Sequence, residues 1–218
     1  MLPLQKRNQL NYWSIALALV FWGVMFRPGV QATFNFWFMM PIATVALASL
    51  GLIVNYPLIK KEELNARNIV TGIVSAILLY GIFWVGNSFM NIVAHQFPDL
   101  VGNKTAQLQS VYTQGNTIPR YVIGMMLFFP IGMCEELYWR GMVQQIMNEK
   151  YGRKRAVIFT VFFYTIVHLS TGNVMLILAA FTCGLFWALL YYYTKSIVPG
   201  VISHMLWDPL IFAIFPIL

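Results

Sequence analysis

The sequence has very little charge for its length. Only 10% of its 218 residues are Asp, Glu, Lys or Arg, whereas an average soluble domain is about 25% charged. Hydrophobic residues make up 59% of the chain, and the mean hydropathy is +0.68. This balance excludes a soluble globular domain, a disordered chain and a coiled coil, and it predicts a polytopic membrane protein.

Cysteine and aspartate are also scarce, which argues against several kinds of functional site. Two cysteines in apolar segments provide neither a disulfide framework nor a CxxC metal motif. The two aspartates are Asp99, in a loop, and Asp208, in a span, so a buried aspartyl dyad is not expected. No HExxH motif and no complete GxSxG motif occurs. The net charge of +7 does not indicate nucleic acid, because Lys and Arg gather in cytoplasmic loops of membrane proteins.

Apolar runs predict an all-α fold, a polytopic transmembrane helix bundle of about seven spans. A spanning helix needs about 20 apolar residues. We expect one integral-membrane domain over residues 1–218, with the first and fifth segments short enough to be partial spans. The candidate segments are Asn11–Phe26, Thr33–Leu58, Asn68–Ala94, Pro119–Met147, Ala156–Leu169, Asn173–Thr194 and Ile197–Leu218.

The basic residues predict the orientation of this bundle. With the N-terminus in the cytoplasm, ten of the 14 Lys and Arg residues fall on the cytoplasmic side, as the positive-inside bias requires. Seven spans then place the C-terminus outside. The long polar stretch His95–Ile118 is interpreted as a solvated external linker, with a substrate-gating lid as the alternative.

Ionisable residues inside the predicted spans are the strongest functional signal. A charge at mid-span costs about 2.5–3.5 kcal/mol on insertion scales, so such residues mark functional sites by default. The residues concerned are Glu135, Glu136, Arg140, His168, His204 and Asp208.

Helical spacing predicts different roles for the two adjacent glutamates, Glu135 and Glu136. Residues four apart share a helix face, whereas neighbours lie about 100° apart. Glu136 is therefore placed to pair with Arg140, a pair that could simply connect helices. Glu135 has no partner on its own helix, which makes it the candidate general base.

The histidines leave two chemistries open. His204 and Asp208 lie four apart and share a face, so the carboxylate can orient the imidazole. Glu135 with His168 could activate a water, and His204 could stabilise the oxyanion formed at a carbonyl. Alternatively, Glu135, His168, His204 and Asp208 are metal-ligand candidates that could bind a divalent metal such as zinc. Both routes lead to hydrolysis of a peptide bond inside the membrane.

Three motifs follow one another on separate apolar segments: Glu135-Glu136-x-x-x-Arg140, Tyr164-x-x-x-His168 and His204-x-x-x-Asp208. In this order they resemble the CPBP family, which comprises the type II CAAX prenyl proteases and the bacteriocin-processing, or Abi, proteins. The resemblance covers roughly residues 120–212, and we take 119–212 as the catalytic-like core.

The resemblance implies a glutamate-dependent intramembrane endopeptidase, a hydrolase often described as a metalloprotease. It assigns water activation to Glu135 and His168, oxyanion stabilisation to His204 and Asp208, and support to Glu136, Arg140 and Tyr164. Two positions depart from the family pattern. Tyr164 replaces the usual Phe and adds a hydroxyl that can reach the site. Asp208 replaces Asn, and an ionised Asp cannot donate to an oxyanion, so it is protonated, orients His204 or binds a metal.

Two other functions compete with the endopeptidase. A non-catalytic immunity or scaffold protein of the same family would bind a partner without cleaving it. A proton- or ion-coupled transporter would also use buried Glu, His and Asp, although such transporters usually contain inverted repeats. For the endopeptidase, the expected partners are the lipid bilayer and a membrane-associated or lipidated protein or peptide substrate, with no nucleic acid. The expected location is a prokaryotic plasma membrane. Oligomeric state stays open.

Overall fold

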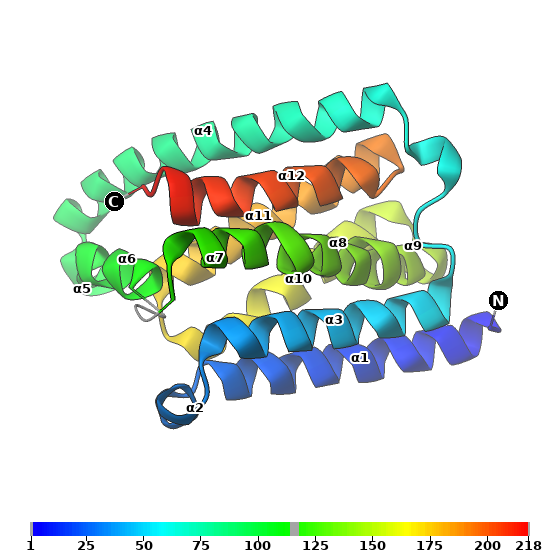
Figure 1. Cartoon of the computed structure of the whole chain (residues 1–218), viewed down its shortest axis with the longest axis horizontal. Helices are drawn as coiled ribbons and strands as arrows, with labels where there is room; N and C mark the ends of the chain where they lie inside the picture. The colour runs from blue at the N-terminus through cyan, green and yellow to red at the C-terminus, as the bar shows by residue number, and fades with distance from the viewer. Residues whose placement is uncertain (1, 114–117, 218) are drawn as a thin grey trace.

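The computed structural model describes residues 2–113 and 118–217, in which the chain forms a bundle of helices (Figure 1). The first half comprises α1 Leu4–Met25, α2 Pro28–Thr33, α3 Phe36–Asn55, a 3-10 turn Lys61–Glu63, α4 Ala66–Gln96, α5 Pro98–Val101 and α6 Lys104–Tyr112. The second half comprises α7 Arg120–Met126, α8 Met133–Tyr138, α9 Gln145–Tyr151, α10 Arg153–Val167, a 3-10 turn Leu169–Thr171, α11 Val174–Thr194 and α12 Val198–Pro209. The all-helical class predicted from the sequence is confirmed.

Asparagine begins four of these helices. In α3, α4, α6 and α11 the side-chain oxygen of the preceding Asn accepts a backbone N–H two or three residues further on, at 2.9–3.0 Å. Such a cap satisfies one of the N–H groups that have no partner inside the helix. The caps are Asn35, Asn65, Asn103 and Asn173.

The continuous helical segment Arg120–Tyr151, which contains α7, α8 and α9, is the centre of the bundle. Its most apolar window is 61% buried, whereas that of α4 is 22% buried despite a higher hydropathy. In Figure 1 this segment runs between α12 on one side and α3 on the other. Side chains on α8 are therefore shielded from the surroundings on all sides, while α4 presents much of its apolar surface outward.

Two irregular turns flank α8. Leu127–Gly132 and Trp139–Gln144 are π-helical turns, and the first contains an extended residue, Phe129, immediately before Pro130. Proline lacks the N–H that a continuing helix needs, which explains a kink at this point. Single π turns inside helices often occur at functional sites, and the short α8 between these two carries Glu135 and Glu136.

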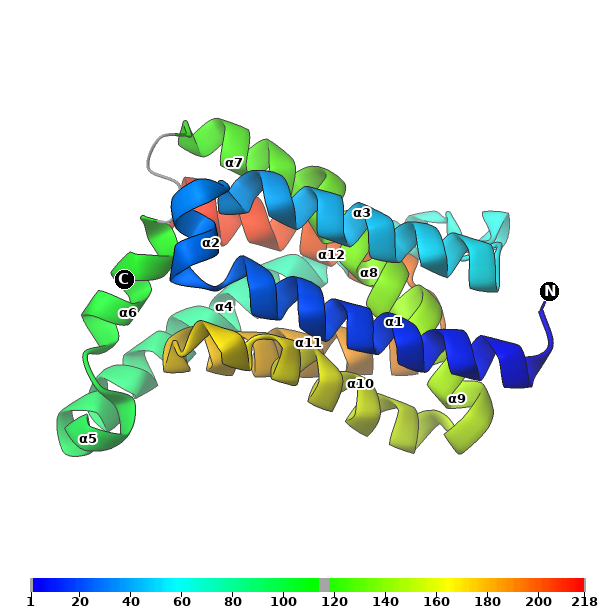
Figure 2. The ribbon, with the colours of Figure 1, turned by 90° about the horizontal axis from the view of Figure 1, so that it is seen from below.

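The remaining helices pack around this centre in two groups. On one side, α12 packs against α4 and α8, and the contact is close because a Cβ at Gly72 would lie 2.6 Å from Ile202 Cβ. On the other side, α1 packs against α3 and α10 (Figure 2), and α10 packs against α11.

The structure contains fewer full-length apolar helices than the seven spans expected from the sequence. Among the described residues, four helices are long and apolar enough to cross a membrane: α3, α4, the Arg120–Tyr151 segment and α11. A shorter apolar helix covers Val198–Ile214, because a π-helical turn continues α12 beyond Pro209. The helix expected to start at Asn11 starts at Leu4, and α10 has only 15 residues.

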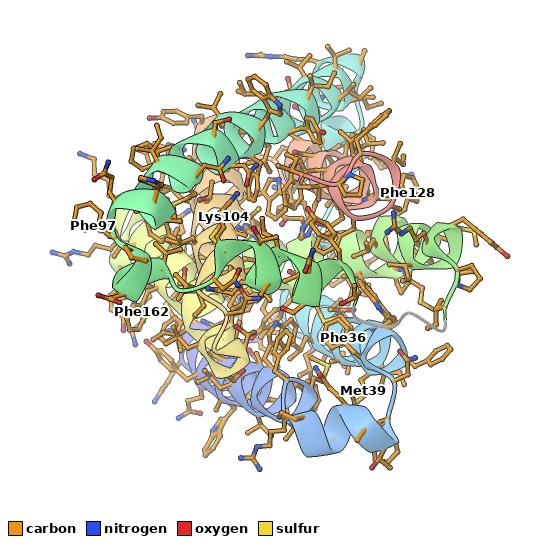
Figure 3. All side chains as sticks on the ribbon, turned by 90° about the vertical axis from the view of Figure 1, so that its left-hand side faces the viewer. Phe36, Met39, Phe97, Lys104, Phe128 and Phe162 are labelled. Carbon is orange, nitrogen blue, oxygen red and sulfur yellow. The ribbon has the colours of Figure 1, made fainter. Side chains whose placement is uncertain are left out.

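The two chain ends and the polar stretch between α4 and α7 can also be compared with the expectations from the sequence. The N- and C-terminal ends lie at opposite ends of the bundle (Figure 1). The stretch His95–Ile118, expected to be a solvated linker, is largely helical in its described part, where it forms α5 and α6, and most of its described residues are exposed or half-buried. Figure 3 looks onto this end of the molecule, where Lys104 at the start of α6 is visible. Residues 114–117 of that stretch, and Leu218 of the last predicted span, lie outside the described residues.

Candidate active site

A chain of charged side chains connects α8 with α12. Arg140 Nη1 donates to Glu136 Oε1 across 2.8 Å, as their spacing predicts. The same carboxylate oxygen lies 3.0 Å from Nδ1 of His204. Glu136 and Arg140 are 0% exposed, so each charge depends on its partner for compensation.

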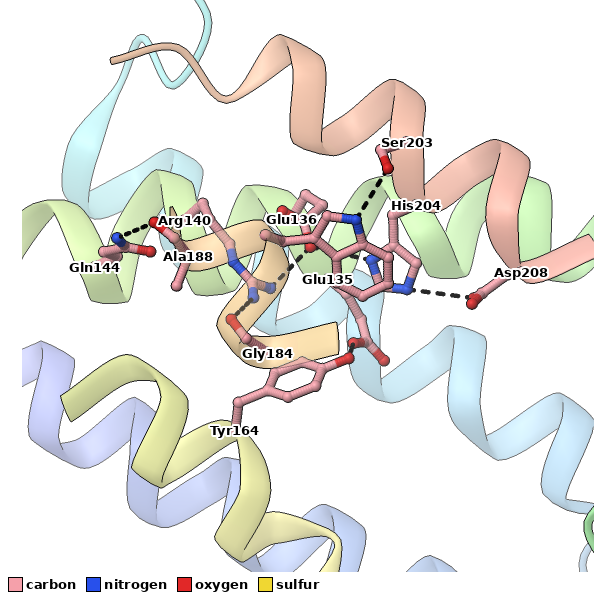
Figure 4. Close-up of polar contacts among 11 residues, drawn as sticks. Glu135, Glu136, Arg140, Gln144, Tyr164, Gly184, Ala188, Ser203, His204 and Asp208 are labelled. Atoms are coloured by element: carbon pink, nitrogen blue, oxygen red, sulfur yellow. Dashed lines mark hydrogen bonds and ion pairs between the residues drawn. The ribbon is translucent and has the colours of Figure 1, made fainter. Parts of the chain in front are cut away.

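The guanidinium of Arg140 is held from three further directions. Its Nη2 donates to the carbonyl oxygen of Gly184 on α11 at 2.9 Å. Its carbon lies 5.1 Å from the centre of the Tyr164 ring and 5.6 Å from that of Trp187, within the range of cation–π attraction. Figure 4 shows Gly184 and Tyr164 approaching the guanidinium from separate helices. Arg140 therefore connects the π-helical turn after α8 with α10 and α11.

Glu135 has a different environment from its neighbour. Its side chain is 4% exposed, and its Oε2 accepts a hydrogen bond from the Tyr164 hydroxyl at 2.9 Å. Among the described residues, Tyr164 is the hydrogen-bond partner of this carboxylate, and no cation forms a salt bridge with it. Glu135 thus keeps oxygen lone pairs available for a water or a substrate.

His204 is fixed on its edges and on its face. Its Nε2 lies 3.3 Å from Asp208 Oδ2, and its Nδ1 faces Glu136. The ring stacks on Trp187 with centroids 3.7 Å apart and planes 18° apart, while the Trp187 indole donates to Ser203 Oγ at 3.1 Å. The predicted orientation of His204 by Asp208 fits this geometry.

His168 lies one residue beyond α10 rather than within the span. Its Nδ1 is 2.8 Å from the carbonyl oxygen of Tyr164, so Nδ1 carries the hydrogen and Nε2 keeps the lone pair. The Trp22 indole N–H on α1 donates to Nε2 at 3.4 Å. This assignment leaves His168 as a proton acceptor at Nε2.

One half-open cavity brings most of the predicted site residues together. Its volume is about 120 Å³, and its polar wall consists of Glu135, Tyr164, His168, His204 and Asp208. The rest of the wall is mainly aromatic and aliphatic. Glu136 and Arg140 do not line this cavity, so the structure separates them from the residues that a molecule in the cavity would contact.

The metal-ligand candidates do not fit a metal in this arrangement. No group of three or more His, Cys, Asp or Glu side chains placed to hold a metal occurs among residues 2–113 and 118–217. Both ring nitrogens of His204 face carboxylate oxygens, which leaves no lone pair on that ring for a metal while both carboxylates are ionised. We therefore derive no step through a metal.

The sequence interpretation missed several residues that build the site. Trp22 and Trp187 come from α1 and α11 and gave no signal beyond being aromatic residues in apolar segments. Gly184 and Gly200 are also required: a Cβ at Gly184 would lie 2.9 Å from Tyr164 Cδ1, and one at Gly200 would lie 2.8 Å from Glu136 Oε2. Small residues at helix contacts were the only available clue.

Taken together, the fold and this cavity define a helical membrane bundle with a buried cluster of ionisable residues of the kind that hydrolases use. Residues 117–210 match the family model described as "Type II CAAX prenyl endopeptidase Rce1-like". This match confirms the resemblance drawn from the three motifs and places the segment in the CPBP/CAAX protease family. Comparison with curated proteins and with solved structures found no match.

Proposed function

We propose that the chain is an intramembrane endopeptidase that hydrolyses a peptide bond of a membrane-associated or lipidated protein with a water activated by Glu135. The observation that carries the proposal is the cavity that places this carboxylate with His168, His204 and Asp208. The match of residues 117–210 to a CAAX endopeptidase family model supports the same reaction class. The site residues and their roles are part of the proposal.

Glu135 is the general base in this mechanism. A water in the cavity donates its proton to the Glu135 carboxylate as its oxygen attacks the carbonyl carbon of the substrate. The Tyr164 hydroxyl, 2.9 Å from Glu135 Oε2, holds one oxygen in place and leaves the other to face the water. His168 Nε2 has one lone pair, and its contact with the Trp22 indole is long at 3.4 Å, so it exchanges that contact for a hydrogen bond from the same water and fixes the water's position. A positioned general base contributes about 10²–10⁴-fold in rate.

His204 stabilises the negative charge that develops on the carbonyl oxygen. Its ring is already fixed by Glu136, Asp208 and the stacked Trp187, so little reorganisation is needed when the charge appears. The contact with Asp208 is long for a hydrogen bond, at 3.3 Å, and the N–H at Nε2 is therefore available to share with an oxyanion. Asp208 acts as an acceptor that orients the ring.

Collapse of the tetrahedral intermediate completes the reaction. The carbon–nitrogen bond breaks, the proton held by Glu135 passes to the leaving amine, and the new carboxylic acid retains the oxygen from water. The acid then ionises and gives its remaining proton to the amine. Glu135 returns to its ionised form. The cavity lies between α1, α3, α11 and α12, and its mainly aromatic and aliphatic wall limits the number of waters around the reacting groups.

The test is a comparison of membrane-protein termini by mass spectrometry. Cells would carry the wild-type chain or Glu135→Gln at matched membrane levels. New termini that require the wild type support the proposal and identify the substrates. Equal sets of termini, with both proteins folded in the membrane, would overturn it and favour a binding or scaffold role; proton-coupled transport of a solute by the wild type alone would assign the cluster to a relay.

A further inference from the structure

The ten basic residues that the sequence places in cytoplasmic segments lie at one end of the bundle. They occur in the first turn of α1, between the end of α3 and the first turn of α4, around the junction of α9 and α10, and directly after α11. In Figure 2 the N-terminus and α9 mark this end, whereas α2, α6 and the C-terminus lie at the opposite end. The opposite end carries three basic residues, Arg27, Lys104 and Arg120. This asymmetry predicts that the first end, which we call the basic end, faces the cytoplasm.

The catalytic cavity opens at the end opposite the basic end. Most of its lining residues are buried, but six are only half-buried. They come from the residue after α1, the start of α3, α6, the first two turns of α11 and the π-helical turn after α12, all of which lie away from the basic end. Phe36, one of the six, is visible in Figure 3, which looks onto this end. We call these residues the rim: Phe26, Phe36, Val111, Leu176, Ala179 and Phe212.

Packed side chains close the cavity toward the basic end. The lining residues farthest from the rim along α11 and α12 are Trp187 and His204, which are 1% and 3% exposed. Toward the basic end, the central segment continues with the π-helical turn Trp139–Gln144, whose residues are all buried. The amide of Gln144 joins this turn to α11 by donating to the Ala188 carbonyl oxygen at 2.9 Å. A polypeptide that came from the basic end would have to separate these packed helices.

The path from the rim to the catalytic groups is short and narrow. Phe212 lies eight residues beyond His204 on the helical segment Val198–Ile214, which corresponds to a rise on the order of 10 Å. About three residues of extended chain cover that distance. A folded domain does not fit a cavity of about 120 Å³, so a polypeptide must enter as an extended segment.

We propose that the substrate enters the catalytic cavity from the extracytoplasmic side, and that the enzyme cuts extended polypeptide segments exposed on that side of the membrane. The inference rests on the proposed function and adds the side from which the substrate comes. A protein attached only to the cytoplasmic leaflet would meet the closed, basic end. The substrate class is therefore an exported peptide or the extracytoplasmic part of a membrane protein.

The reactivity of single cysteines from each side of the membrane tests the direction of entry. The background carries Cys134→Ala and Cys183→Ala, and the rim reporters are Ala179→Cys and Phe36→Cys. Ala179 lies four residues before Cys183, so it shares the face of α11 that lines the cavity and lies one turn nearer the rim. Intact cells and inverted membrane vesicles would be treated with a membrane-impermeant methanethiosulfonate, and the remaining free thiol would be measured after denaturation.

Two exposed positions at opposite ends of the bundle provide matched controls. Ala106→Cys lies on α6, and Glu62→Cys lies in the 3-10 turn before α4 at the basic end. In intact cells we expect loss of the free thiol at both rim reporters and at Ala106→Cys, and its retention at Glu62→Cys. In inverted vesicles the Glu62→Cys thiol should be lost.

Three labelling results would overturn the proposal. Rim thiols that react only in inverted vesicles, together with Glu62→Cys, would place the opening on the cytoplasmic side. A Glu62→Cys thiol that reacts in intact cells would reverse the orientation of the whole bundle. Rim thiols that react from neither side, while both controls react, would show that the cavity is closed at this end as well.

The positions of the cleaved bonds separate this proposal from the one before it. Termini that require the wild type rather than Glu135→Gln should lie in segments outside the cytoplasm. Termini confined to cytoplasmic segments would overturn the side of entry while leaving the endopeptidase intact. The absence of any such terminus would overturn the endopeptidase and with it the substrate class, whereas the thiol reactions would still decide on which side the cavity opens.

Discussion

The hydroxyl of Tyr164 donates a hydrogen bond to Oε2 of Glu135 across 2.9 Å, and it thereby connects α10 with the central helix inside the cavity. The resemblance leads one to expect Phe at this position, so the hydroxyl is an addition of this chain. It gives Glu135 a fixed orientation while leaving its second oxygen free for chemistry.

Tyr164→Phe should keep the fold and slow cleavage. Hydrogen bonds to charged groups contribute about 1.5–3 kcal/mol, and loss of this one should lower kcat/KM by about tenfold. The measurement is the cleavage rate of the purified protein in detergent. Tyr193→Phe is the control, because Tyr193 is 75% exposed and lies outside the cavity; equal rates for the two variants would show that the hydroxyl plays no part.

The two adjacent glutamates should respond differently to the same substitution. Glu136→Gln leaves the buried Arg140 without its ion-pair partner, and breaking a buried pair in this way costs about 3–5 kcal/mol. Glu135→Gln retains an oxygen that accepts from Tyr164, so its stability should stay near that of the wild type. Thermal unfolding of both variants in detergent measures this; similar losses of stability would contradict the separate roles we assign.

Gly200→Ala should destabilise the protein through Glu136. The new Cβ would lie 2.8 Å from Glu136 Oε2, and overpacking of this kind costs about 1–3 kcal/mol. The control is Gly23→Ala on α1, where an added Cβ meets nothing within 4 Å and where alanine should stabilise the helix slightly. Melting temperatures that fall equally for both would mean that Gly200 provides no space for the carboxylate.

Removal of metal should leave activity unchanged. The ring nitrogens of His204 are both directed at carboxylates, so the ring has no lone pair to offer a metal. The purified protein would be dialysed against EDTA, and its metal content and cleavage rate would be measured before and after. Activity that disappears on dialysis and returns with zinc would contradict this prediction.

Asp208→Asn should also retain activity, because an amide oxygen can still accept from His204.

Contacts along a single helix could be predicted from the sequence. The four-residue spacing of Glu136 and Arg140 predicted their ion pair, found at 2.8 Å. The same spacing predicted the approach of Asp208 to His204, found at 3.3 Å. In both cases helical periodicity alone decides which side chains share a face.

Contacts between helices could not be predicted in the same way. The approach of His204 to Glu136 depends on how α12 crosses α8, and no spacing in the sequence encodes a crossing angle. Trp22 reaches His168 from a helix more than a hundred residues away in the chain. The two π-helical turns around α8 also interrupt the 3.6-residue helical period, which a sequence pattern assumes to be continuous.

Boundaries were least predictable at the polar ends of helices. Hydropathy placed the start of the first segment at Asn11, but α1 begins at Leu4 because polar residues continue the helix. Arg7 is buried in this extension and donates to Glu149 at 2.8 Å. This partly buried ion pair between distant segments compensates a charge that hydropathy assigns to a loop.

The most direct test of the central role of Glu135 is a rate measurement on purified protein. Wild type, Glu135→Gln and Glu62→Gln would be reconstituted in liposomes with a substrate found by the comparison of termini. Glu62 is an exposed carboxylate in the 3-10 turn before α4 and controls for the loss of one acidic group. We expect Glu62→Gln to cleave at the wild-type rate and Glu135→Gln to be slower by about 10²–10⁴-fold. A folded Glu135→Gln protein that cleaves as fast as Glu62→Gln would contradict the assignment of Glu135 as the base.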